Sequence, residues 1–421
     1  MAVVSQRVPR NLAAPVEAPV AGSGSCLPRP AWVRFGQLLL FGVYVALLAG
    51  RFTLDRISPS LPTFDLRLIM VYALAVGIAV WYLGAHRFTS SPVRTPGVFP
   101  FAVWVGWMCL SAVWAPQGAR VAEVLTDFGV LAGLILFAVV LIARLPKEVT
   151  NCVWIWVFWT AVIYFLGAML EGPGAQGRYS AFGGGPNVFV RIMVIGAFAA
   201  LYLSVRRRKM WYLFAVPIFA VGASLSGSRG GLLSAGIVAI VFFVPIMRLL
   251  GAKRAWTLVG VAVVGIIGLT LAGAGAVADF LQERFVQQTL VERYASDRTD
   301  IAQAALDLWT QHRVFGTGLD GYFALQHVEG QFAYPHNLLL ATAAEAGTIG
   351  AVLFLLALLA LVVPVLRRRP LSLAAFTGLL VGLFLFSASM FSGDYYDSRL
   401  MWFFLVLAVV EASRPTAASS P

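Results

Sequence analysis

The chain has 421 residues, of which 60% are hydrophobic and only 12% are charged, and its formal net charge is +12. Soluble globular proteins carry a charged fraction of about 25%, so this composition excludes an ordinary soluble protein. A positive net charge by itself is compatible with nucleic-acid binding. Here, however, the charges lie between long apolar blocks, so we expect a lipid bilayer as the partner and no nucleic acid.

The apolar blocks are about as long as a helix must be to cross a hydrocarbon core of ~30 Å. We therefore predict an all-α, polytopic membrane protein with about 12 transmembrane helices. The predicted spans are 35–50, 67–84, 97–115, 122–143, 151–170, 187–205, 210–225, 231–249, 256–278, 346–366, 371–391 and 399–413.

The predicted spans form one membrane domain, residues 32–413, with a single large outer loop at 279–337. Residues 1–31 are rich in Pro, Ala and Ser and contain no apolar core of a signal peptide, so they are expected to be a disordered cytoplasmic tail. Residues 414–421 are expected to be a short cytoplasmic tail.

The distribution of basic residues predicts the orientation. With the N-terminus inside and the loops assigned alternately, 19 of the 31 basic residues fall on the inner side, including all three lysines. The clusters Arg206–Lys209 and Arg367–Arg369 both fall there. The other 12 basic residues are all arginines on the outer side. We expect four of them to extend toward lipid phosphates: Arg51, Arg56, Arg67 and Arg120.

The large outer loop contains a predicted amphipathic helix from Arg298 to His312. Its apolar residues recur at helical spacing: Ile301, Ala304, Ala305, Leu308 and Trp309. Asp297 is a candidate N-cap, and Asp300 lies in the first turn. A loop of this length in a compact domain is usually functional.

The first candidate site is Ser224–Gly231, at the predicted outer start of the eighth span. Ser226 or Ser228 is expected to cap that helix, and the glycines allow close approach of a ligand to the backbone. Together with Arg229, a helix N-terminus there would bind an anion, and a lipid-linked phosphate is the natural one at this depth. The alternative is a Gly/Ser turn whose arginine extends to lipid.

The second candidate site opens the sixth span. Its loop runs from Arg178 to Asn187, with Asn187 a plausible N-cap and Arg191 one turn further along. The alternative is an ordinary flexible loop.

The last two candidates lie in and after the large loop. Arg298 is a candidate cationic ligand, or else part of a solvated helix face. His336, followed by Asn337, lies where the chain re-enters the membrane, and a histidine there can accept a proton from a hydroxyl near neutral pH. A structural role for the histidine is the alternative. Glu345 is expected to cap or pair locally, or to support His336.

Taken in order, these features resemble the O-antigen ligase and polymerase superfamily of membrane glycosyltransferases. The residues that carry the resemblance are Arg178 with Gly185-Pro186-Asn187, Ser226-Gly-Ser-Arg229-Gly-Gly, Arg298 with Trp309 and Phe315-Gly-x-Gly318, and His336-Asn337 with Glu345-x-Gly347. The resemblance covers residues 170–350 well and the whole chain loosely.

The resemblance implies a GT-C-like fold and a metal-independent, inverting transfer at the outer face of the bacterial cytoplasmic membrane, without a cofactor. The donor would be a glycan on undecaprenyl pyrophosphate, and the acceptor a hydroxyl of lipid A-core or of another glycan. Arg229 and Arg298 match the pyrophosphate-binding arginines, and His336 matches the base. The implied substrate-binding residues are Arg178, Arg191, Asn187, Ser226, Ser228 and Asn337.

Several alternatives stay open. A polymerase, which joins lipid-linked repeat units, would use the same apparatus as a ligase. A transporter would place ionisable residues near the bilayer midplane, and the predicted spans hold almost none. A synthase of the peptidoglycan type would need a carboxylate such as Asp297 or Asp300 in the large loop.

We expect no metal site. The outer side lacks metal-ligand spacing, and so do the three cysteines, Cys26, Cys109 and Cys152. Asp394 and Asp397 are expected to contact Arg399, with a cation site as the alternative.

Overall fold

The computed structural model describes residues 30–51, 53, 60, 62–85, 95–174, 177–271, 298–326, 334–368 and 370–414. In these residues the regular structure is helical, and the only strand-like pairings are two isolated bridges, Thr53 with Asp65 and Pro173 with Tyr179. The predicted all-α fold is therefore confirmed. The predicted tails lie almost entirely outside the described residues.

The first six α-helices of the chain belong to two packed groups. These helices are α1 (Ala31–Ala49), α2 (Leu66–Ala85), α3 (Val98–Leu110) with the 3₁₀ turn η2 (Ser111–Trp114), α4 (Val121–Arg144), the single turn α5 (Lys147–Thr150) and α6 (Cys152–Glu171). Each long helix is apolar around most of its circumference, which is typical of helices surrounded by lipid and by other helices. α4 packs against α1, α2 and α3, so α1–α4 pack together, whereas α6 packs mainly against α7 (Gly185–Arg206).

The second group contains two of the candidate arginines, Arg191 and Arg229. It comprises α7 (Gly185–Arg206), η4 (Met210–Phe214), α8 (Ala215–Leu225), α9 (Arg229–Val241) and α10 (Phe243–Leu271). The axes of Arg229–Val241 and Phe243–Val261 differ by 74°. Pro245 accounts for the break, because it has no N–H to continue the helix. The predicted span 231–249 is therefore interrupted by a bend after Val241.

The last group includes two helices in the segment 279–337, which was predicted to be the large outer loop. It comprises α12 (Arg298–Gln311), α13 (Gly321–Gln326), α14 (Leu338–Arg367), α15 (Leu373–Ser389), η6 (Tyr396–Ser398) and α16 (Arg399–Ser413). The amphipathic helix expected from Arg298 is confirmed, and its apolar residues Ile301, Ala305 and Leu308 are buried. α14 is broken at Gly347, whose φ is 69°.

Six helices in the described residues are long and apolar enough to cross a membrane, or seven if the bent pair of α9 and α10 forms one span. The six are α1, α2, α4, α5 with α6, α7 and α14. Shorter apolar helices are Val98–Trp114, Tyr212–Leu225 and Leu373–Ser389. The chain is a multi-pass membrane protein, while the predicted number of about 12 spans is not confirmed.

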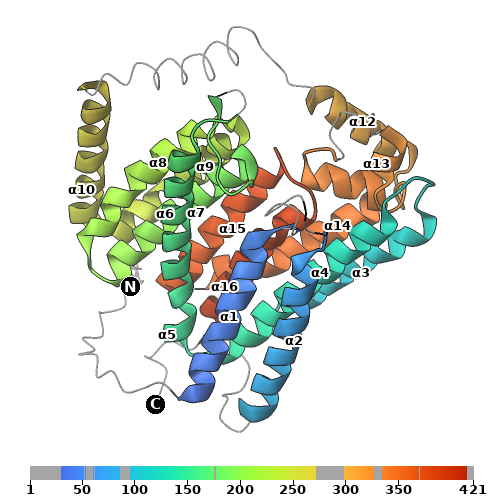
Figure 1. Cartoon of the computed structure of the whole chain (residues 1–421), viewed down its shortest axis with the longest axis horizontal. Helices are drawn as coiled ribbons and strands as arrows, with labels where there is room; N and C mark the ends of the chain where they lie inside the picture. Colours follow the sequence, from blue (N-terminus) through green and yellow to red (C-terminus); the bar gives the residue numbers. More distant parts are fainter. Residues whose placement is uncertain are drawn as a thin grey trace, which may run out of the picture.

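The C-terminal helices form the centre of the bundle. Figure 1 shows α15 and α16 between the group α1–α4 and the group α6–α9, with α14 beside α3. α16 packs against α15, α14 and α4, and α15 packs against α7 and α9. An aromatic cluster at the centre joins Trp104, Phe354 and Trp402, with ring centroids 5.3–5.7 Å apart. This cluster joins α3 to α14 and α16, while α15 provides the contacts to α7 and α9.

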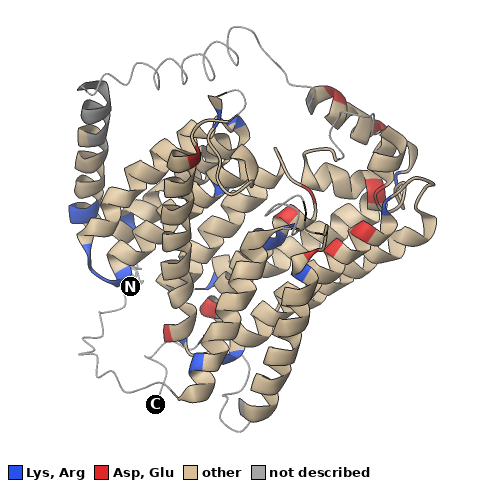
Figure 2. Ribbon diagram, viewed as in Figure 1, with Lys and Arg blue, Asp and Glu red and all other residues tan. Residues whose placement is uncertain are grey.

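Every second loop along the chain lies at the same end of the helix bundle, which we call the site end. There α1 ends and α2, α4, α7, α9, α14 and α16 begin, and side-chain contacts join these ends. Red and blue segments lie together there in Figure 2, near the start of α4 and the end of α1. The alternation agrees with the predicted topology. Which membrane face the site end occupies stays a prediction.

Candidate functional site

Two candidate residues on α7 form hydrogen bonds to the same residue, Ser392. Asn187 and Arg191 are four residues apart, so their side chains lie on one face of the helix. Asn187 Nδ2 donates a hydrogen bond to Ser392 Oγ at 2.8 Å, and Arg191 Nη2 donates to the Ser392 carbonyl at 2.6 Å. Arg191 is 8% exposed and also donates to the carbonyl of Ala388 at 3.3 Å. α7 is thereby fastened to the loop that follows α15.

A further chain of hydrogen bonds joins Asn187 to the Gly/Ser motif. Ser228 Oγ donates to Asn187 Oδ1 at 2.8 Å, and the Ser228 N–H donates to Ser226 Oγ at 3.1 Å. Arg178 Nε donates to the Ser226 carbonyl at 3.0 Å. The structure thus joins five candidate binding residues in one network: Arg178, Arg191, Asn187, Ser226 and Ser228.

The capping roles expected for these residues differ from those observed. Ser228 is the N-cap residue of α9, but its side chain does not cap the helix and bonds to Asn187 instead. α7 begins at Gly185, with Gly184 at its N-cap, so Asn187 lies inside the first turn. The expected caps are wrong because the polar side chains are used for contacts between helices.

The start of α9 lies close to the same loop. Arg229 is the first residue of α9 and is half-buried. A Cβ atom at Gly230 would lie 2.4 Å from Cβ of Phe391, and one at Gly231 would lie 2.4 Å from Cγ1 of Val190. The two glycines are therefore needed for close packing of α9 against α7 and Phe391.

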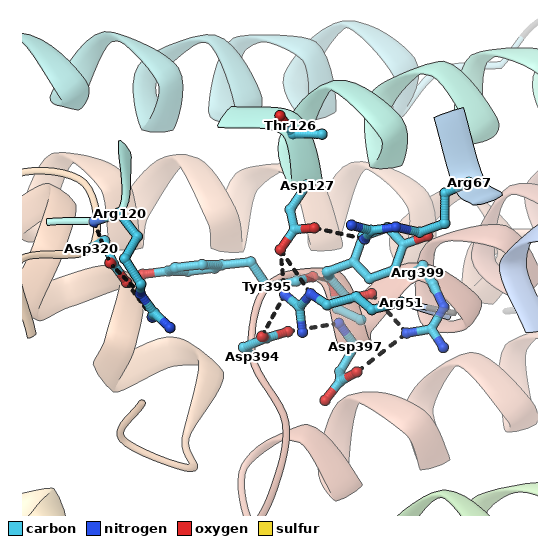
Figure 3. Close-up of polar contacts among 12 residues, drawn as sticks. Arg51, Arg67, Arg120, Thr126, Asp127, Asp320, Asp394, Tyr395, Asp397 and Arg399 are labelled. Carbon is cyan, nitrogen blue, oxygen red and sulfur yellow. Dashed lines mark hydrogen bonds and ion pairs between the residues drawn. The ribbon is translucent and has the colours of Figure 1, made fainter. Parts of the chain in front are cut away.

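The arginines expected to reach lipid phosphates are instead paired with carboxylates, as Figure 3 shows. Arg67 Nη1 lies 2.6 Å from Asp127 Oδ1, and its Nη2 lies 2.5 Å from Asp65 Oδ2. Arg51 pairs with Asp127 and lies 2.7 Å from Asp394 Oδ2.

Arg120 pairs with Asp320, with Nη2 and Oδ1 2.9 Å apart. The expectation of lipid contacts is therefore wrong for Arg51, Arg67 and Arg120, because the bundle brings carboxylates to them. Arg56 lies outside the described residues.

The loop between α15 and α16 supplies the remaining carboxylates. Arg399 Nη1 lies 3.2 Å from Asp397 Oδ1, which confirms the predicted contact. Burial works against ionisation of Asp397, but the charges of Arg399, Arg191 and Arg51 outweigh it, so its pKa is lowered. In the part of the chain that the structure describes, no group of three or more His, Cys, Asp or Glu residues could hold a metal ion.

The candidate base is buried at the start of α14. His336 is 5% exposed, and its ring meets that of Tyr334 edge-on, with centroids 4.6 Å apart. Burial, together with the charges of Asp397 and Asp394, raises the pKa of Tyr334 to about 12. Asn337 Oδ1 accepts the N–H of Leu340, so this candidate binding residue caps α14.

His336 has an unusual backbone conformation. Its φ is 58°, in the left-handed region that costs a non-glycine residue about 1–2 kcal/mol. Strain of this kind is retained where the surroundings fix it, often at functional sites.

Glu345 does not pair locally. Its Oε2 accepts the hydroxyl of Tyr395 at 2.9 Å and the N–H of Asp320 at 3.2 Å. Glu345 is 4% exposed and Tyr395 is 8% exposed. Glu345 therefore joins α14 to two segments far away in the sequence.

Arg298 is the first residue of α12, and nothing further is described of its side chain. α12 packs against α14 and α13 through a small core of Ile301, Ala305, Leu308, Tyr322 and Ala344. The helix that begins at Arg298 is therefore fixed to the first half of α14.

These features define a multi-pass helical membrane protein with a buried, arginine-rich polar site at one end of its bundle. A family model described as O-antigen ligase matches residues 214–355, about a third of the chain. The predicted resemblance to the O-antigen ligase superfamily is thereby confirmed, and the match supports glycan transfer of the ligase or polymerase type. A search of curated proteins found no match.

The matched region contains Arg229, Arg298, His336 and Glu345, whereas Arg178, Asn187 and Arg191 lie before it. Sequence reasoning missed Ser392, and it gave Tyr395 and Asp320 no role. Only Asp394 and Asp397, which were expected to contact Arg399, pointed to the loop that contains Ser392 and Tyr395. A serine or tyrosine in a short loop carries no spacing signal, so packing alone identifies these partners.

Proposed function

We propose that this protein transfers a glycan from undecaprenyl pyrophosphate to an acceptor hydroxyl, in the manner of an O-antigen ligase. The observation that carries the proposal is the hydrogen-bonded network from Arg178 to Arg191, which adjoins the N-terminus of α9 and Arg229. Cationic side chains and a helix N-terminus favour a diphosphate.

In the proposed reaction the acceptor hydroxyl attacks the anomeric carbon, and the bond from that carbon to the diphosphate oxygen breaks. His336 takes the hydroxyl proton, and undecaprenyl pyrophosphate leaves with the electron pair. Negative charge develops on the leaving group, and fixed cationic donors stabilise it more in the transition state than in the ground state. Arg229 and Arg298 have this role, and Arg191 supports them.

The substrate side of the proposal is more specific than the family match. The acceptor is proposed to be lipid A-core, at the outer face of the bacterial cytoplasmic membrane. A polymerase that joins lipid-linked repeat units is the second candidate, because the family match covers that chemistry equally. A transporter of lipid-linked sugars would have no need of the buried base.

The test is a profile of lipid-linked glycans in cells that lack the gene, complemented with wild type, Arg229→Ala or His336→Ala. Long undecaprenyl-linked polymer that never reaches an acceptor supports a ligase. Single lipid-linked repeat units without long polymer support a polymerase. A profile unchanged by the deletion would overturn glycan transfer.

A further inference from the structure

We infer that Tyr395 and Glu345 are positioning residues. Their hydrogen bond sets the distance between two parts of the site: the histidine half, which is His336 at the start of α14, and the arginine half, which is Arg191 and Arg229 with the loop after α15. This inference rests on the proposed function, since it concerns the alignment of groups used in the same transfer. Neither residue is assigned to contact substrate.

The first step is the position of the bond itself. Tyr395 lies in the loop after α15 and Glu345 in α14, and the hydroxyl donates to Glu345 Oε2 at 2.9 Å. Both side chains are buried, at 8% and 4% exposure. Breaking a buried hydrogen bond leaves a polar group without a partner away from water, so this contact constrains the two segments.

The second step is the set of contacts between the loop after α15 and the helices that carry the arginines. Ser392 binds both Arg191 and Asn187, and Phe391 contacts Gly230 at the start of α9. Asp394 and Asp397 are anchored by Arg51 and Arg399. The residues next to Tyr395 are thus fixed to the arginine-bearing helices.

The third step is the position of Glu345 in the helix that follows His336. Glu345 lies in the straight first part of α14, which begins two residues after His336 and ends at the break at Gly347. A helical segment of this length is rigid, so the place of Glu345 determines the place of the helix start. The same carboxylate oxygen accepts the N–H of Asp320, whose carboxylate binds Arg120.

Figure 3 shows the geometry directly. The Tyr395 ring extends from the cluster around Arg51 and Asp394 toward the pair formed by Arg120 and Asp320. The ring therefore lies between these two groups of charged residues, and its hydroxyl bonds to Glu345. Without that hydroxyl the ring still fills the space, but the distance between the halves is no longer fixed by a directional bond.

The consequence is a specific kinetic effect. A displacement of about 1 Å between reacting groups can reduce the rate by about 10²-fold. Binding of the diphosphate depends instead on the arginines and the N-terminus of α9. We expect Tyr395→Phe to lower kcat between about 10- and 100-fold and to leave the KM for the donor within about twofold. Glu345→Gln keeps an acceptor oxygen for Tyr395, so it should be impaired less than Glu345→Ala.

The experiment uses the full chain in lipid nanodiscs, with lipid-linked glycan and acceptor lipid extracted from cells that lack the gene. Tyr44→Phe is the matched control, because it removes another hydroxyl, bonded to Thr160 at 3.0 Å, in the hydrophobic core. Both variants should lower the melting temperature, but only Tyr395→Phe should lower kcat. The double variant Tyr395→Phe with Glu345→Ala should be no slower than Glu345→Ala alone, since the two residues act as one unit.

The outcomes separate the two proposals. If Arg229→Ala and His336→Ala keep the wild-type rate, the proposed function fails. If those variants are inactive while Tyr395→Phe keeps the wild-type kcat, only the positioning role is overturned. A rise in donor KM at unchanged kcat would also overturn it, because it would place Tyr395 in binding.

Discussion

Arg67 and Asp127 form a buried ion pair across 60 positions of sequence, with Nη1 and Oδ1 2.6 Å apart. Their side chains are 6% and 4% exposed. The same carboxylate also binds Arg51, so one aspartate on α4 holds the end of α1 and the start of α2. The arrangement of the site end therefore depends on charges that neutralise one another away from water.

Removal of this shared carboxylate should destabilise the protein strongly. Asp127→Asn leaves Arg67 and Arg51 short of one negative charge, and breaking a buried pair from one side costs about 3–5 kcal/mol. We expect a clear fall in the unfolding midpoint in nanodiscs, followed by tryptophan fluorescence. Glu123→Gln is the control, since Glu123 is exposed on the same helix, and its midpoint should not change. Equal midpoints for both variants would contradict the importance of the pair.

A negative charge at position 187 should weaken donor binding without disturbing the fold. Asp at this position still accepts from Ser228, and the Ser392 hydroxyl can rotate to donate to it. The added charge repels a diphosphate nearby, by about 2 kcal/mol at 8 Å and an effective dielectric constant of 20. We expect Asn187→Asp to raise the donor KM at least about 10-fold.

Salt provides the check on this electrostatic explanation. The KM difference between wild type and Asn187→Asp should shrink as ionic strength increases, because Asn187 and Arg229 are only half-buried and salt screens charges that are not fully buried. An increase in KM that is independent of salt would indicate a steric cause.

The pH dependence of stability should include a contribution from Asp65. Burial opposes ionisation of Asp65, but the hydrogen bonds and charge of Arg67 outweigh it and lower its pKa below the ordinary value. A carboxyl with a lowered pKa in the folded state stabilises the fold above its unfolded pKa of about 4. That stabilisation is lost as the pH falls through the folded pKa.

Wild type should therefore lose more thermal stability than Asp65→Asn between pH 6 and pH 3. The measurement is the melting temperature of both proteins across this range, in the same nanodiscs. Parallel curves would show that the Asp65–Arg67 pair does not contribute.

The break in α14 should tolerate no side chain at position 347. Gly347 has φ 69°, and a Cβ atom there would lie 2.0 Å from the carbonyl oxygen of Val314. The adjacent Thr348 N–H donates to the carbonyl of Arg313 at 2.8 Å, so the break docks the segment after α12. Gly347→Ala should therefore lower the melting temperature and expose this segment to limited proteolysis.

Gly236 provides a matched control within α9. An added Cβ at Gly236 meets nothing within 4 Å, so Gly236→Ala should be neutral or slightly stabilising, by up to about 1 kcal/mol. If the two alanine variants behave alike, the close contact at the break of α14 is not important for stability.

The candidate site was partly predictable. The helix beginning at Arg298 followed from apolar spacing, and the resemblance followed from short motifs in a fixed order. Contacts such as Asn187 with Ser228 and Ser392 could not be predicted, because a polar side chain at a helix start is usually expected to cap that helix. The bend after Val241 was missed because the apolar composition continues through Pro245.

The amino-acid sequence by itself determined that the chain is helical, multi-pass and embedded in lipid, because apolar length and the placement of charges are local properties. It also indicated the resemblance to the O-antigen ligase superfamily, through short motifs in a fixed order. Only the tertiary structure decided which charges meet. Arg51, Arg67 and Arg120 find carboxylates 76, 60 and 200 residues away. Such pairs depend on how the helices pack, and tertiary packing likewise brings the Tyr395 hydroxyl to Glu345.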